Sequence, residues 1–106
     1  MGQGSPAMNE RRSLDRKPVR FLVQHQSSTD AGYEVDYASD LSPGGMFIRS
    51  RVTPIPHATV HVQFAPAKDA PLVSTFARVT HITPNGFGTA FIGLDSEGAR
   101  AISSVL

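Results

Sequence analysis

Apolar and polar residues alternate along most of the chain after residue 18. Val19, Phe21 and Val23, for example, are each separated by one polar or smaller residue. Alternation with a period of two is typical of a β-strand that buries one face and exposes the other. The pattern therefore predicts a protein built mainly from half-buried strands.

Six such segments are separated by clusters of turn-forming residues. They lie at 18–23, 33–37, from 46 onward, 57–64, 72–82 and 87–94. Short strands with turns every 8–12 residues favour a small antiparallel barrel or sandwich. From Asp95 the period changes, because Ala99, Ile102 and Leu106 recur at helical spacing. We expect an all-β fold, a six-stranded antiparallel β-barrel, closed by a helix over 95–106.

The chain length of 106 residues is that of one domain with a single modest core. Its sequence contains no cysteine, which excludes disulfides and thiolate-metal sites. No apolar run approaches the roughly 20 residues of a membrane-spanning helix. The N-terminus also lacks the apolar core of a signal peptide, so a cytoplasmic protein without a membrane partner is expected.

Charge is unevenly distributed along the chain. Residues 1–20 carry five basic and two acidic side chains (+3), whereas the remaining residues carry five and seven (−2). Residues 1–9 are rich in Gly, Ser and Pro without periodicity, and we expect a disordered tail there. The sequence thus predicts a basic N-terminal arm attached to a slightly acidic body. Such an arm is either a solubilising tail or part of an anion-binding site.

Catalytic and metal-binding patterns are weak. His57 and His61 have the spacing of a helical metal pair, but in a strand four residues span roughly 13 Å. Asp36 and Asp40 are separated by the same distance, which argues against a paired-carboxylate site. The sequence holds no nucleophile elbow, phosphate-binding loop or zinc-protease motif. We therefore expect neither an enzyme nor a metal protein.

Two short motifs remain. Arg12-Ser13-Leu14-Asp15-Arg16 reads R-x-x-x-R, and Asp40-Leu41-Ser42-Pro43-Gly44-Gly45 reads D-x-S-x-x-G. Guanidinium forks suit phosphate and the O6/N7 edge of guanine, while a carboxylate and a hydroxyl can pair with the opposite edge of guanine. Each motif alone is more often a solvated surface or a capped turn. Together they indicate a site for a planar, anionic ligand.

The two motifs, in their sequence context, resemble the PilZ domain family. The similarity covers ERRSLDRKPVRFLV and YASDLSPGGMFI, and it extends from about Glu10 to the end of the chain. The segment from Gly86 to Phe91 is similar to a G-x-G-x-x-F strand of that family. The resemblance implies a barrel of the PilZ-like, split-barrel type over 10–106. Its parts would be a flexible ligand-binding arm (10–17), the barrel (18–94) and the helix (95–106).

The resemblance also implies a ligand, the bacterial second messenger cyclic di-GMP, and no cofactor. Carried over residue by residue, the implied ligand-binding residues are Arg11, Arg12, Arg16, Asp40, Ser42 and Gly45. An arginine in the position of Arg11 accompanies an intercalated ligand dimer in the family, which implies two ligands per domain. Arg78 and His81 fall on a strand that borders the site in some members. Ordering of the arm would then signal to a separate protein effector in motility, biofilm or exopolysaccharide control.

Two other functions stay open at the level of sequence. A PilZ-fold adaptor would bind a protein without using the nucleotide. A single-stranded nucleic-acid-binding barrel would need aromatic side chains on an exposed sheet face. Phe21, Tyr33 and Tyr37 are the candidates for such a face, and their alternation places them in the core instead. We therefore expect no nucleic-acid partner.

Overall fold

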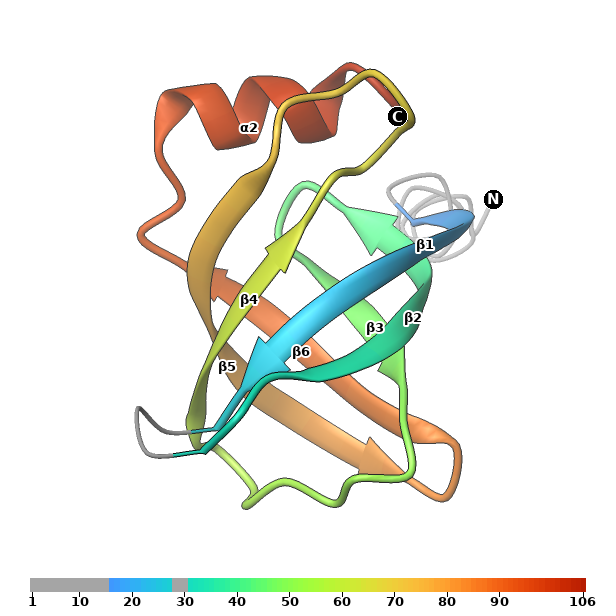
Figure 1. The fold of residues 1–106 in the computed structure, drawn as a ribbon, viewed down its shortest axis with the longest axis vertical. Coiled ribbons are helices and arrows are strands. Elements are labelled where there is room, and N and C mark those ends of the chain that lie inside the picture. Colours follow the sequence, from blue (N-terminus) through green and yellow to red (C-terminus); the bar gives the residue numbers. More distant parts are fainter. Residues whose placement is uncertain (1–15, 28–30) are drawn as a thin grey trace, which may run out of the picture.

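The computed structural model describes residues 16–27 and 31–106 as a closed antiparallel barrel with one helix at its end (Figure 1). The elements are β1 (Lys17–Gln26), β2 (Glu34–Ser42), β3 (Gly45–Arg49), β4 (Thr59–Phe64), β5 (Val73–Thr83), β6 (Gly86–Ile92) and α2 (Ser96–Ser103). The predicted fold class, six antiparallel strands followed by a C-terminal helix, is confirmed.

The strands follow the order β1-β2-β3-β6-β5-β4 around the barrel. Pairing of β1 with β4, in which Val23 lies opposite Phe64, joins the two ends of the sheet. This pairing closes the sheet into a barrel, so that no strand lies at an open edge along its whole length. Inward positions fill the barrel with apolar side chains, including Leu41, Ile48 and Phe87, all of which are fully buried.

The helix lies across one end of the barrel, beside the link from β4 to β5 (Figure 1). The Asp95 side chain accepts a hydrogen bond from the Gly98 backbone N–H at 2.7 Å and so caps the helix. Ile102 is fully buried, as predicted. Ala99 lies within α2 as predicted but is exposed. Leu106 lies beyond the end of α2 at Ser103 and is also exposed, so neither residue packs on the barrel as expected.

The start of β1 is attached to the same end of the molecule. The Lys17 ammonium donates a hydrogen bond of 2.8 Å to the Val105 carbonyl, just beyond α2. This bond ties the first residue of β1 to the segment that follows the helix. The turn between β2 and β3 also lies at this end, near the helix (Figure 1).

The orientation of β2 differs from the sequence prediction. Asp36 points inward, where its Oδ2 lies 2.7 Å from Nε2 of His25, a side chain only 4% exposed. Because neighbouring residues of a strand face opposite ways, Tyr37 is turned outward and is 40% exposed. Tyr33, which precedes the strand, is 41% exposed. The placement of both tyrosines in the core was therefore wrong, whereas Phe21 packs against the core as predicted.

The fourth strand is shorter than predicted. It starts at Thr59, and His57 precedes it in a turn with a φ of 66°. His57 and His61 therefore do not share a strand. Among residues 16–27 and 31–106 no group of three metal-ligating side chains is found. In the same part of the chain no helix is long and apolar enough to cross a membrane.

Candidate functional site: an open face around Arg16 and Asp40

The pairing of β1 with β2 brings the ends of the two sequence motifs together. Lys17 lies opposite Leu41 and Pro18 lies opposite Asp40, so Arg16 emerges beside the second motif. Its Nη1 is 3.9 Å from Oδ2 of Asp40. The arginine side chain is 52% exposed and the aspartate 28% exposed. Exposed ion pairs of this length contribute little stability, so both groups can exchange this contact for a ligand.

A bulge in β2 sets the direction of Asp40. The register with β3 shifts between Ala38 and Asp40, and an extra residue in a strand re-aims the side chains beside it. Asp40 consequently lies on the outer face, where its Oδ1 accepts a hydrogen bond from the Phe47 backbone N–H at 3.2 Å. One carboxylate oxygen is thus held by the backbone, while the other faces Arg16.

Ser42 and Gly45 form the β2–β3 hairpin. The Ser42 hydroxyl donates a hydrogen bond of 3.3 Å to the Gly45 carbonyl. Gly45 is buried against β6, and a Cβ at this position would overlap the Thr89 carbonyl oxygen. The glycine of the D-x-S-x-x-G motif therefore permits close approach of two strands. The neighbouring Gly44 has open space around its Cα and no such requirement.

Small residues occupy the middle of the outer face beside these residues. One row across the strands runs from Ser42 through Gly45 and Ala90 to Arg78. Neighbouring strands are about 4.8 Å apart, so the row from β2 to β5 spans about 14 Å. Ala90 carries only a methyl group, so a planar ligand can lie close to the sheet at that position.

A second row carries two rings on the same face. It runs from Asp40 through Phe47 and Gly88 to His81. The Phe47 and His81 rings are 5.9 Å apart with an angle of 31° between their planes. A Cβ at Gly88 would overlap the His81 ring, so the glycine leaves room for the imidazole against the sheet. Sequence reasoning gave Phe47 no role, although its alternation with the buried Met46 and Ile48 places it outward.

The sequence-predicted site residues are therefore distributed as follows. Arg16 and Asp40 are in contact, Ser42 and Gly45 lie in the adjoining hairpin, and Arg78 and His81 lie across the face on β5. Arg11 and Arg12 lie outside the described residues. We name the surface formed by Arg16, Asp40, Ser42, Gly45, Phe47, His81 and Arg78 the motif face.

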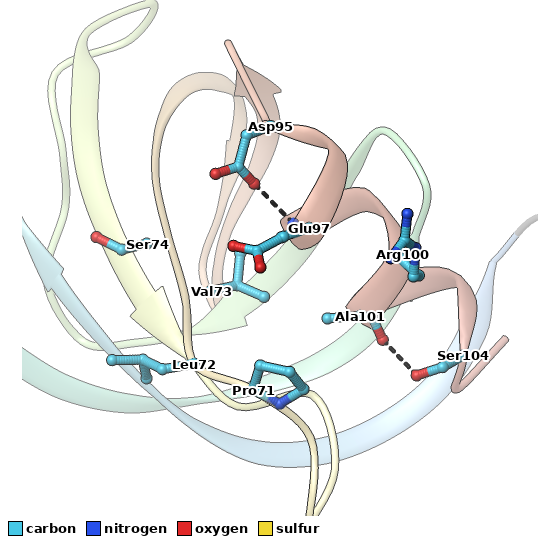
Figure 2. Close-up of a pocket in the computed structure, with 10 residues that line it drawn as sticks. Pro71, Leu72, Val73, Ser74, Asp95, Glu97, Arg100, Ala101 and Ser104 are labelled. Carbon is cyan, nitrogen blue, oxygen red and sulfur yellow. Dashed lines mark hydrogen bonds between the residues drawn. The ribbon is translucent and has the colours of Figure 1, made fainter.

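Two hollows lie elsewhere on the described part of the barrel, and neither is lined by a residue of the two motifs. One groove of about 450 Å³ lies between α2 and the start of β5, floored by Leu72 and Val73 and bordered by Glu97 and Arg100 (Figure 2). A second hollow, of about 520 Å³, lies beside Asp36 at the other end of the barrel. The motif face differs from both because it is an open surface, suited to a ligand that another segment of chain covers.

Comparison with known proteins identifies the class to which this fold and this face belong. The family model of the PilZ domain matches residues 10–106. The chain therefore belongs to the PilZ domain family, as the motifs indicated. No curated protein matches it in sequence.

Two solved structures share the fold at low sequence identity. The inhibitor of motility MotI/DgrA from Bacillus subtilis matches with a TM-score of 0.73 and 13% identity, over 85% of this chain. This chain spans 46% of the length of that protein. The PilZ domain of YcgR from Escherichia coli, solved with c-di-GMP, matches with a TM-score of 0.68 and 12% identity. That match covers 85% of this chain and 84% of the YcgR domain.

Proposed function

We propose that this chain is a receptor for cyclic di-GMP, without catalytic activity of its own. Its membership of the PilZ family and its likeness to a PilZ domain solved with c-di-GMP support this ligand. The observation that carries the proposal is the contact between Arg16 and Asp40. Through it, the end of the R-x-x-x-R motif lies beside the carboxylate of D-x-S-x-x-G, so the two motifs contribute to one surface.

The chemistry of each group suits one part of the ligand. Arg16, with Arg11 and Arg12 from the arm, would supply guanidinium forks to phosphate and to the O6/N7 edge of guanine. Asp40 would accept hydrogen bonds from the donor edge of guanine through the oxygen that now faces Arg16, and the Ser42 hydroxyl would add a further polar contact.

The small residue on the motif face favours a ligand with planar bases. Ala90 carries only a methyl group, over which a purine can lie, and the rings of Phe47 and His81 offer a stacking surface beside it. Arg78 on β5 would add a positive charge at the far end of the face.

We assign the arm to residues 10–17, the barrel to 18–94 and the helical segment to 95–106.

The arm bears on the number of ligands bound and on how binding is signalled to another protein. Arg11 directly precedes the first motif, and on this basis we assign two ligands per domain, as an intercalated dimer. Ligand binding would fold the arm over the motif face and so create a composite surface for a separate protein in the cytoplasm. Because a structural neighbour is an inhibitor of motility, control of motility is the process we favour.

Substitution of Arg16 tests the proposal at its central contact. Charge-assisted hydrogen bonds contribute about 1.5–3 kcal/mol, so Arg16→Ala should weaken cyclic di-GMP binding about ten- to 150-fold in calorimetry. Arg51→Ala, an exposed arginine on the link after β3, is the matched control and should bind like the unmodified protein. Equal affinity of Arg16→Ala and Arg51→Ala for cyclic di-GMP would show that the ligand does not bind at Arg16.

A further inference from the structure

A histidine-centred cluster lies on the outer surface of β4, separate from the motif face. His61 shares a hydrogen bond of 3.0 Å with the Tyr33 hydroxyl through Nδ1, and one of 3.1 Å with the Ser74 hydroxyl through Nε2. The Phe76 ring meets the imidazole edge-on, with 5.0 Å between centroids. Both ring nitrogens thus have partners on this chain, so covering the cluster leaves neither of them unpaired.

Large apolar side chains lie beside this histidine and further along the same outer face, open to solvent. Leu22 is 54%, Tyr33 41%, Phe76 55% and Ile92 39% exposed. Apolar patches exposed on soluble domains are often functional. We name the surface formed by Leu22, Tyr33, His61, Gln63, Phe76 and Ile92 the β4 face.

The β4 face carries no acidic or basic side chain other than its histidine. On β1 the outward position beyond Leu22 is Arg20, and on β5 the outward position beyond Phe76 is Arg78. Because β1 and β5 both run antiparallel to β4, these two arginines lie beyond opposite ends of the face. A centre without formal charge that is rich in aromatic residues has the composition of an interface core.

We infer that the β4 face binds a second copy of this chain through a two-fold symmetric contact. A two-fold contact brings the same surface together twice, so a charge near its centre would repel its own copy. Here the centre offers carboxamides instead, because Gln63 lies opposite Gln24 on the neighbouring strand. An amide both donates and accepts hydrogen bonds, and it can therefore pair with an identical amide. The chain's net charge of +1 adds little long-range repulsion between copies.

The dimension of the face predicts a weak dimer. With its polar members the face approaches the lower range of specific interfaces, and the curvature of a small barrel limits how much of it two copies can bury together. We expect a monomer–dimer equilibrium in the micromolar to millimolar range, observable without nucleotide.

Sedimentation velocity of the full chain, over protein concentrations from about 10 μM to about 1 mM and without nucleotide, tests the inference. The weight-average mass should rise from the 11.4 kDa of one chain toward twice that value. Phe76→Arg should raise the dimer Kd about tenfold or more, because it places a charge and its copy in an apolar contact. Gln63→Glu should do the same through like charges near the two-fold axis.

An exposed apolar residue outside the β4 face provides the matched control. Ile55 is 75% exposed, and Ile55→Arg should leave the dimer Kd unchanged. Circular dichroism melting of each variant shows whether it is folded, and Gln63→Glu, a surface change, keeps the test available if Phe76→Arg unfolds. A mass of one chain at every concentration would overturn the inference, as would an equal loss of dimer in Ile55→Arg. Neither result bears on cyclic di-GMP binding, which this measurement does not involve.

Discussion

The guanidinium of Arg16 lies 3.9 Å from the carboxylate of Asp40, across the pairing of β1 with β2. This distance is longer than a hydrogen bond, and the arginine is half exposed. Such a contact places the two charged groups side by side but is weak enough for a ligand to replace it. An anionic ligand that also has hydrogen-bond donors can therefore bind here, with its anion on Arg16 and its donors on Asp40.

Removing the charge of Asp40 should weaken ligand binding while leaving the fold intact. The amide oxygen of Asp40→Asn can still accept the Phe47 N–H, but its NH₂ group cannot accept the donors of guanine. We expect affinity for cyclic di-GMP to fall about ten- to 150-fold in calorimetry. Asp69→Asn, at an exposed loop position, is the control. An unchanged affinity in Asp40→Asn would show that this carboxylate does not bind the ligand.

The two glycines at the β2–β3 turn should respond differently to alanine. Gly45→Ala forces a Cβ into the Thr89 backbone, whereas Gly44→Ala meets open space. Overpacking of this kind costs about 1–3 kcal/mol, which lowers the Tm by about 5–20 °C in a domain of this length. Gly44→Ala should stay within about 1 kcal/mol of the unmodified protein. Equal melting temperatures for the two variants would show that β3 and β6 can separate there at no cost.

The pair of buried His25 and partly exposed Asp36 should stabilise the end of the barrel opposite the helix. His25→Leu removes their 2.7 Å contact, and the loss of one such hydrogen bond costs about 0.5–1.5 kcal/mol. Thermal unfolding should therefore show a clear drop in Tm. Asp36→Asn retains a hydrogen-bonding partner for the ring and should lose less. A Tm for His25→Leu within about 1 °C of the unmodified protein would contradict this role.

Nucleic-acid binding can be tested directly, because Tyr33, Tyr37 and Phe76 turn out to be exposed aromatic side chains. Binding of single strands combines stacking with a basic groove. Phe76 and Tyr33 instead lie on the β4 face, which carries no basic side chain other than its histidine, and Arg20 stacks on the Tyr37 ring at 4.2 Å. We expect no shift of random single-stranded oligonucleotides at about 10 μM protein in a gel assay at about 0.15 M salt. A shift of the oligonucleotides would contradict this prediction and support a nucleic-acid-binding function.

Much of this fold could be predicted from the sequence because it depends on local patterns. Alternation defined the strands, and Asp95 marked the start of the helix, where it is the cap. The orientation of β2 could not be predicted in this way, since Tyr33, Val35 and Tyr37 alternate as a buried face would. Their exposure results from a non-local contact, in which the buried His25 draws Asp36 into the barrel.

The candidate site was predictable to a similar degree. The motifs named Arg16 and Asp40, but only the register of β1 with β2 brings them together. Gly45 was expected to be a ligand-binding residue. In the structure it has a packing role, because the Thr89 backbone fills the space that a side chain at Gly45 would occupy. Phe47 and His81 had no motif of their own, and they meet because Gly88 lies between them in the sheet.

The most direct test of the central claim is a calorimetric titration of the unmodified chain with cyclic di-GMP, with cyclic di-AMP as the matched ligand. The adenine ligand keeps both phosphates but lacks the O6 acceptor and the N2 donors of guanine. We predict binding of cyclic di-GMP at micromolar affinity or tighter, with two ligands per domain, and at least about tenfold weaker binding of cyclic di-AMP. Absence of heat with cyclic di-GMP, or equal affinity for the two ligands, would contradict the account.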